Sequence, residues 1–213
     1  MCYHTSLITD TAALEERLGR QMHGEARGQL PIPRTRAFAR PWWPVISAEA
    51  PRVISWKQWG LIPEWAEHPD AFLERTPTFH TASETAYEEP AFQSAASAGR
   101  RCLIPVTSFV EWQHREAEGD AEPEKVPYEI RMRHEAIFCL GGIYEGDTYS
   151  ILTRPAQAVL ATINKDKRQP VIIPKAFKGD WLNPALSAAD VHRFCENREV
   201  VDLVAVELVK DVV

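Results

Sequence analysis

The chain has 213 residues, of which 45% are hydrophobic and 25% charged, and its formal net charge is −6. This length and composition are typical of one globular domain that buries its own core. The negative charge excludes a protein that coats long stretches of duplex DNA through its phosphates, although one local basic groove remains compatible with it. No run approaches the ~20 apolar residues of a membrane span, and the first residues lack the pattern of a signal peptide. We therefore expect a cytoplasmic protein.

The hydrophobic pattern predicts many strands with helices interspersed irregularly, which indicates an α+β fold. Prolines recur between Leu30 and Pro51, so this segment is predicted to be extended and looping. The charged segment Arg115–Glu124 is predicted to be an exposed hairpin loop. We expect a curled, barrel-like antiparallel sheet in one domain over residues 1–213. Helices are predicted over residues 10–20, 94–99, 155–163 and 187–197, and strands over 53–62, 102–112, 128–132, 136–144, 149–153, 171–173 and 200–208.

The four cysteines are far apart, and no two of them form a CxxC pair. This spacing and the expected compartment argue against a zinc knuckle and against a disulfide framework. Cys102, Cys139 and Cys195 lie in apolar surroundings and are predicted to be small buried thiols. No glycine-rich phosphate loop, HExxH or GxSxG motif occurs, so we expect neither a metal nor a cofactor.

Cys2 differs from the other cysteines because it directly follows the initiator methionine. Removal of Met1 would leave an amine and a thiol on one residue, and both groups are partly deprotonated near neutral pH. Such an aminothiol condenses with an aldehyde to an imine, which the sulfur then closes into a thiazolidine ring. While Met1 is attached, the amine is held in a peptide bond and this chemistry cannot occur. A cysteine at this position by chance alone is the alternative interpretation.

Five sequence motifs, the first of which contains Cys2, follow one another along the chain. They are MCYH, WGLIPEW (Trp59–Trp65), FHTASET (Phe79–Thr85), RCLIPVTSFVEW (Arg101–Trp112) and KRQPVII (Lys167–Ile173). Together they resemble the SRAP family of SOS-response-associated peptidases, over residues 1 to about 185. The resemblance implies that Cys2 becomes N-terminal and links covalently to the aldehyde of an abasic site in single-stranded DNA. It also implies lyase and autopeptidase activities. We further expect a monomer that associates with the nucleoid when bound to DNA.

The resemblance assigns a catalytic carboxylate to Glu111 in SFVEW, which could shuttle protons during imine formation and ring closure. Its place between apolar residues and Trp112 predicts partial burial and a raised pKa. The alternative is a surface glutamate at the end of a strand. Several family positions are substituted in this chain, and two of them bear on the catalytic residues. The usual asparagine of the FHTASET segment falls on His80, and Asn164 is the candidate for the place of the family's histidine.

Other residues in or beside the motifs are candidates for contact with DNA. Indole rings stack on unpaired bases, and cationic side chains bind phosphates. For each tryptophan, packing in the core is the alternative, and for each arginine it is a solvated surface charge. The candidate contacts are His4, Arg36, Arg40, Trp42, Trp43, Trp65, Trp112, Thr153, Arg154 and Arg168.

Three functions therefore remain open from the sequence. The favoured one is a protein that crosslinks its own Cys2 to an abasic site and shields it. A diverged module that binds single-stranded or modified DNA without crosslinking is the second. A thiol peptidase acting on other proteins is the third, and the lack of a His/Asn pair at recognisable spacing weighs against it.

Overall fold

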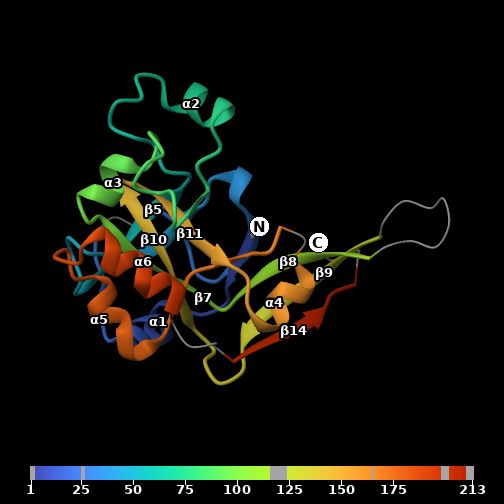
Figure 1. The fold of residues 1–213 in the computed structure, drawn as a ribbon. Helices are drawn as coiled ribbons and strands as arrows, with labels where there is room; N and C mark the ends of the chain where they lie inside the picture. Colours follow the sequence, from blue (N-terminus) through green and yellow to red (C-terminus); the bar gives the residue numbers. More distant parts are fainter. Residues whose placement is uncertain (1–2, 25–26, 116–123, 165, 198–201, 210–213) are drawn as a thin grey trace.

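The computed structural model describes residues 3–24, 27–115, 124–164, 166–197 and 202–209. The described strands form two antiparallel-rich sheets with short helices at their edges (Figure 1). One sheet has the strand order β14 (Leu203–Glu207), β9 (Glu124–Met132), β8 (Ser108–Arg115), β1 (His4–Leu7) and β3 (Ile32–Arg36).

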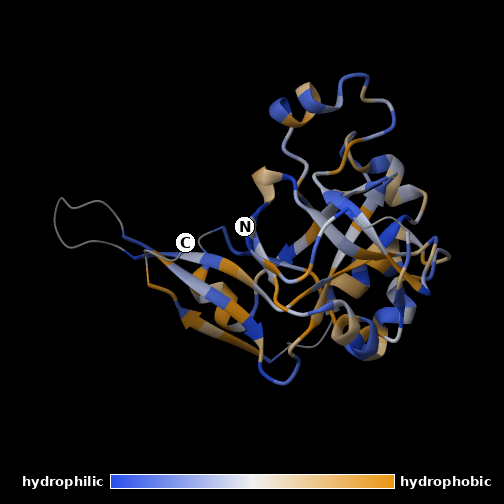
Figure 2. Cartoon of the chain, turned by 180° about the vertical axis from the view of Figure 1, so that it is seen from behind, coloured by the Kyte–Doolittle hydropathy of each residue, from blue (hydrophilic) through white to orange (hydrophobic). Residues whose placement is uncertain are grey.

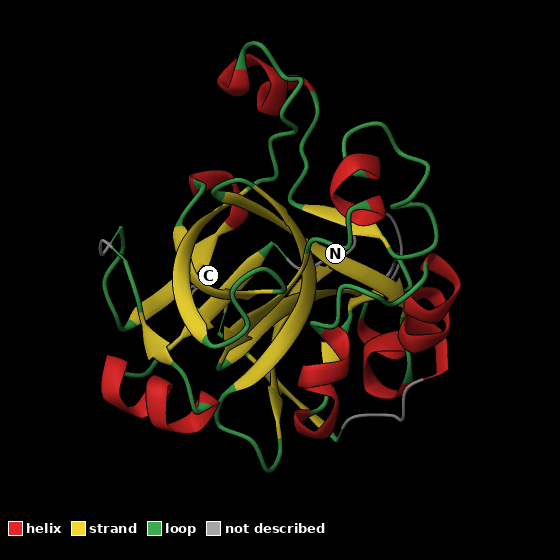
Figure 3. Ribbon diagram, turned by 90° about the vertical axis from the view of Figure 1, so that its left-hand side faces the viewer, coloured by secondary structure: helices red, strands yellow, loops and turns green. Residues whose placement is uncertain are grey.

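The second sheet curls until it is partly closed, as the ring of strands in Figure 3 shows. Its closing contact is the parallel pairing of β11 with β5. Along its main path lie β12 (Arg168–Pro170), β11 (Thr148–Pro155), β10 (Phe138–Glu145), β7 (Arg101–Val106), β4 (Trp42–Ser47), β5 (Val53–Trp59) and β2 (Gln21–Met22). β13 (Ile172–Ile173) pairs with β10, and β6 (His80–Ala82) pairs with β11. The predicted α+β class with a curled sheet is thus confirmed.

The helices are short and lie around the sheets. They are α1 (Thr11–Leu18), α2 (Pro69–Arg75), α3 (Gln93–Ser97), α4 (Ala158–Ile163), α5 (Lys178–Trp181) and α6 (Ala188–Asn197), with 3₁₀ turns η1 (Ala37–Ala39) and η2 (Lys175–Phe177). The predicted first helix is confirmed, because Asp10 Oδ1 accepts a hydrogen bond from Ala13 N at 2.8 Å and Gly19 ends the helix with a φ of 63°. The structure adds β1, β2, α2, β6, β12 and α5, which the sequence pattern did not predict, and the segment predicted to be extended and looping contains β3 and β4.

Buried aromatic rings join the strands of the curled sheet. Trp43, Trp59 and Trp181 are fully buried, and each indole donates its Nε1 hydrogen to a backbone carbonyl of another element, at 2.8, 2.9 and 2.9 Å. A buried indole needs such an acceptor, because an unpaired N–H in an apolar interior is costly. In Figure 2, hydrophobic colouring runs along the central strands and the peripheral loops are mostly hydrophilic.

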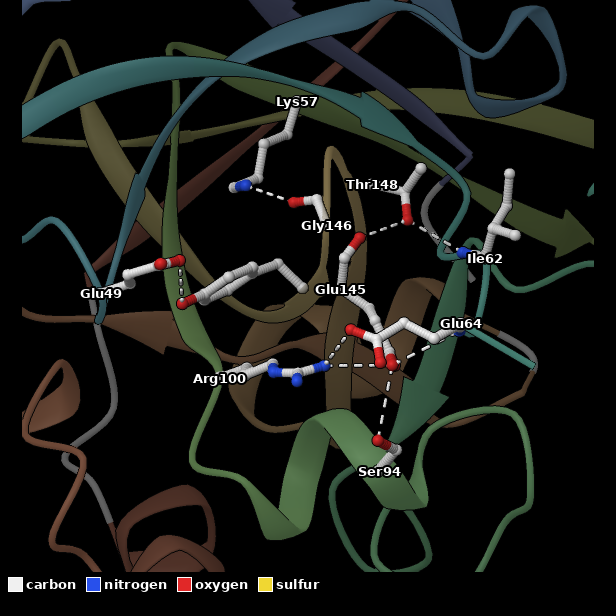
Figure 4. Close-up of polar contacts among 10 residues, drawn as sticks. Glu49, Lys57, Ile62, Glu64, Ser94, Arg100, Glu145, Gly146 and Thr148 are labelled. Atoms are coloured by element: carbon white, nitrogen blue, oxygen red, sulfur yellow. Dashed lines mark hydrogen bonds and ion pairs between the residues drawn. The ribbon is translucent and has the colours of Figure 1, made fainter. Parts of the chain in front are cut away.

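A carboxylate at the end of β10 fastens the arm that carries α2, which projects from the sheets in Figure 1. Glu145 is buried, and its Oε1 lies 3.0 Å from Arg100 Nη1 and accepts a hydrogen bond from Glu64 N at 3.4 Å (Figure 4). Nearby, Thr148 Oγ1 accepts a hydrogen bond from Ile62 N at 2.9 Å (Figure 4). These contacts fix the base of the arm against the body of the protein.

The closest packing in the curled sheet predicts a strong effect of one added methyl group. A Cβ on Gly142 of β10 would lie 2.5 Å from Ser150 O and 2.6 Å from Ile104 Cδ1. We expect Gly142→Ala to lower the free energy of unfolding by about 1–3 kcal/mol, as overpacking of a core does, measured by urea denaturation. Gly179→Ala is the matched control, since nothing lies within 4 Å of its Cβ. Equal stability of both variants would contradict this packing.

Candidate active site

A cavity of about 440 Å³ lies where β8 continues past its pairing with β1. β1 pairs with the first residues of β8, so that His4 lies opposite Val110. Beyond that point the cavity is bounded by side chains from the N-terminal segment, from both strands of the β8–β9 hairpin and from the segment after α4. The lining residues are Tyr3, Glu111, Trp112, His114, Lys125, Asn164 and Asp166.

Glu111 is the buried acid of this cavity. It lies in β8 and is 1% exposed. Burial disfavours its charged form and raises its pKa to about 7, and the nearby Asp166 carboxylate acts in the same direction. The predicted burial and raised pKa of Glu111 are both confirmed. A carboxyl group with this pKa exchanges protons readily at neutral pH, which suits general acid–base catalysis.

Asn164 holds the Glu111 carboxyl in place. It follows the last residue of α4 and is 2% exposed. Its Nδ2 donates to Glu111 Oε2 at 2.8 Å and to Arg168 O at 2.7 Å, while its Oδ1 accepts from Asp166 N at 2.8 Å. An amide nitrogen carries two hydrogens, so both donors are engaged. In this structure Asn164 therefore positions the Glu111 carboxyl.

His80 lies close to the cavity but does not line it. It begins β6, and its ring meets the ring of Tyr3 edge-on at a centroid distance of 4.8 Å and that of Trp59 at 5.8 Å. Tyr3 is thus the side chain that connects His80 to the cavity of Glu111. Cys2, the predicted nucleophile, lies outside the described residues.

The four predicted tryptophan contacts have different environments. Trp43 is fully buried in the core and bonded to Pro105 O, so we remove it from the candidate DNA contacts. Trp42 is half-buried with Arg27 stacked over its ring at 4.7 Å. Trp65 is 56% exposed on the α2 arm, and Trp112 lines the cavity. The adjacent tryptophans of β4 point to opposite faces because side chains alternate along a strand.

Several predicted polar contacts are engaged within the protein. Arg154 is 6% exposed and donates to Glu196 O at 2.7 Å, and Thr153 is buried with its hydroxyl donating to Thr81 O at 3.1 Å. Arg168 makes two hydrogen bonds to the Glu84 carboxylate, at 2.7 and 2.8 Å. These contacts hold β11 and β12 against neighbouring segments of the protein, and binding of DNA by these three residues stays a prediction.

The remaining candidates lie on the surface near β1. Arg36 is exposed at the end of β3, opposite His4 in the register. Burial and the guanidinium groups of Arg36 and Arg34 hold the pKa of His4 below its usual value. Arg40 pairs with Asp70 of α2 at 2.6 Å. Of these two arginines, Arg36 is the one that makes no ion pair among the described residues.

Sequence reasoning did not single out four residues of the cavity wall: Tyr3, His114, Lys125 and Asp166. Tyr3 and His114 each lie within three residues of a predicted site residue, so proximity in the sequence could have indicated them. Lys125 reaches the cavity only through the β8–β9 register, in which it lies opposite His114. No sequence signal sets that register.

Within the ranges that the structure describes, no group of three or more His, Cys, Asp or Glu side chains could hold a metal ion. None of the helices in these ranges combines the length and the apolar character of a membrane span. Cys102, Cys139 and Cys195 are buried free thiols, as predicted.

Comparison with known proteins gives a family match over the whole chain. A family model described as SOS response associated peptidase (SRAP) matches residues 1–213. Abasic site processing protein YoaM of Bacillus subtilis is 30% identical over 142 aligned positions, and the match covers 62% of this chain and 58% of that protein. Abasic site processing protein HMCES of Xenopus tropicalis is 33% identical over 79 residues, which are 37% of this chain and 22% of that protein. The matches thus span less than two thirds of either relative.

Solved structures share the fold over nearly the full length. A protein from Bacteroides thetaiotaomicron superposes with a TM-score of 0.85 at 27% identity, covering 99% of this chain and 93% of its own. A protein from Bordetella bronchiseptica has a TM-score of 0.75 at 21% identity, covering 97% of this chain and 99% of its own.

The raised pKa of Glu111 predicts a pH-dependent cost to stability. In the unfolded chain this carboxyl loses its proton near pH 4.5, and in the folded protein near pH 7. Between these values the folded state binds the extra proton, so stability falls as the pH rises through this window. We expect Glu111→Gln to be increasingly stabilised relative to wild type from pH 4.5 to 7, by up to about 3 kcal/mol, measured by urea denaturation.

Glu16→Gln on α1 is the control for this measurement, because Glu16 is exposed. Its difference from wild type is expected to stay constant across the same pH range. A constant difference for Glu111→Gln as well would show that its carboxyl is not held protonated by burial.

Proposed function

The chain belongs to the SOS response associated peptidase (SRAP) family, and on this basis we propose that it processes abasic sites in DNA. The names of its relatives, abasic site processing proteins, support this substrate class. The structural observation that carries the proposal is the cavity in which Glu111, with a pKa of about 7, lies beside the N-terminal strand.

We propose that Cys2 is the nucleophile after removal of Met1. Its amine adds to the aldehyde carbon of the ring-opened abasic sugar and gives a carbinolamine, which loses water to form an imine. The thiolate then adds to the imine carbon, and the nitrogen takes up a proton. One aldehyde and one aminothiol thus yield one thiazolidine and one water. The ordinary pKa values of the two groups, near 8 and 8.5, make both steps feasible at neutral pH.

The position of the N-terminal strand supports this assignment. Tyr3, which follows Cys2 in the chain, lines the same cavity as Glu111. His4 pairs with Val110, the residue before Glu111. The strand register therefore brings the beginning of the chain to the buried acid.

Glu111 would manage the protons of this sequence. Its protonated form donates to the carbinolamine hydroxyl as that leaves as water, and its ionised form accepts the proton that the thiol releases. Asn164 keeps one carboxylate oxygen fixed by its hydrogen bond, and cannot itself transfer a proton as an imidazole would. We therefore propose that opening of the cyclic sugar is assisted less in this protein than in relatives with histidine at this position.

A single strand is the form of DNA that suits this cavity. The aldehyde must reach a buried carboxyl, and a paired, stacked nucleotide would first have to leave the helix at an energetic cost. The half-buried indole of Trp112, which lines the cavity, offers a face on which an unpaired base can stack, and the exposed indole of Trp65 on the α2 arm offers another.

The covalent step is tested by the loss of the thiol. The processed protein is expected to form a denaturation-resistant adduct with a single-stranded oligonucleotide that contains one abasic site, seen as a shifted band on a denaturing gel. Cys2→Ala keeps the amine, so it can form only a reversible imine, and we expect it to give no stable adduct. Cys102→Ala is the control, because Cys102 is buried away from solvent. An adduct of undiminished yield with Cys2→Ala would contradict the mechanism.

A further inference from the structure

The outer wall of the cavity contains a cation that the proposed covalent chemistry does not use. Lys125 lies in β9, is exposed and lines the cavity together with His114. Within the described part of the chain, Lys125 makes no ion pair or side-chain hydrogen bond. Its ammonium group is therefore available to a ligand in the cavity.

The register of the hairpin places this lysine beside an aromatic surface. His114 lies opposite Lys125, and Trp112 lies opposite Pro127. Side chains of directly opposite residues share a face of the sheet, as do residues two apart on one strand. Trp112, His114 and Lys125 therefore lie on one face of the hairpin. The ring of His4 on β1 continues this face, 6.4 Å from the ring of Trp112.

Two of the acidic side chains near this face are paired within the protein or buried. Glu129, opposite Val110, is paired with Arg131 and accepts a hydrogen bond from Ser108 Oγ at 2.7 Å. Asp166 lines the cavity from the segment after α4, and the Glu111 carboxyl is buried. Among the described residues that line the cavity, Lys125 on the hairpin wall is the one lysine or arginine.

The sequence also limits how far this surface can extend. Residues 116–123, which join the two strands of the hairpin, include Glu116, Glu118, Asp120 and Glu122. A polyanion would be repelled by such a segment. The cationic wall is therefore suited to one phosphate group near the cavity, rather than to a long track of phosphates.

We propose that Lys125 binds the phosphodiester that flanks the abasic sugar, while Trp112 stacks on the neighbouring base and His114 is the second polar group on this wall. This inference rests on the proposed function, because it presupposes that the cavity receives the abasic nucleotide. A phosphate fixed next to the sugar holds the sugar in register with the cavity, as phosphate contacts do in DNA recognition generally.

A binding cycle tests this contact separately from the covalent step. The probe is a fluorescein-labelled single strand with one tetrahydrofuran abasic analogue, which has no aldehyde and cannot crosslink. In two further strands, the phosphate on either side of the analogue is replaced by a neutral methylphosphonate. We expect Lys125→Ala to weaken binding of the normal strand about two- to fivefold, the size of an exposed charge contact, measured by fluorescence anisotropy. One of the two methylphosphonate strands should bind wild type more weakly than the normal strand does, by the same factor that Lys125→Ala causes. Lys125→Ala itself should bind that strand and the normal strand equally well.

Lys175→Ala is the matched control, since Lys175 is also exposed but does not line the cavity. It should bind all three strands as wild type does. Suppose that wild type binds the normal strand and that each methylphosphonate lowers the affinity of Lys125→Ala as much as that of wild type. Lys125 then contacts neither phosphate, and this inference is overturned while the proposed function stands. If wild type binds none of the strands and forms no adduct with abasic DNA, the proposed function fails with it.

Discussion

The hydrogen bond from Asn164 to Glu111 is the contact on which the rest of the site depends. It joins the end of α4 to β8 across 53 positions of sequence, at a nitrogen–oxygen distance of 2.8 Å. A carboxyl buried this deeply is costly unless it is hydrogen-bonded or protonated. The structure provides both: Asn164 donates to one oxygen, and burial raises the pKa to about 7. The result is a carboxyl group in a fixed position that changes protonation state near neutral pH.

The same asparagine links this acid to the wall of the cavity opposite the hairpin. Its second N–H binds Arg168 O, and its oxygen accepts from Asp166 N. Arg168 is in turn held by Glu84. The amide therefore acts as a structural element, and the acid–base work of the proposed reaction falls to Glu111 and to the aminothiol of Cys2. Under the proposed mechanism, this division leaves the covalent chemistry to Glu111 and Cys2 and gives opening of the sugar ring less assistance.

Much of the fold and part of the site could be predicted from the sequence, because they depend on local patterns. The flanking apolar residues indicated that Glu111 is buried, and its distance from Arg168 indicated Asn164. The sequence could not show which of Trp42 and Trp43 faces the core. The alternation of side chains along a strand indicates only that the two rings lie on opposite faces of the sheet. It also could not show that Arg154 and Thr153 bond to backbone carbonyls of distant segments. Lys125 was missed because strand register depends on tertiary packing.

The proposed mechanism depends on proton transfer by the Glu111 carboxyl during formation of the crosslink. The most direct measurement is the rate of adduct formation by wild type and Glu111→Gln between pH 5 and 9, each as the processed protein with excess abasic single strand. The amine and thiol of Cys2 titrate in both proteins, so the ratio of the two rates isolates Glu111. We expect wild type to react faster and the ratio to change with pH around 7. A ratio that is the same at every pH would contradict this mechanism.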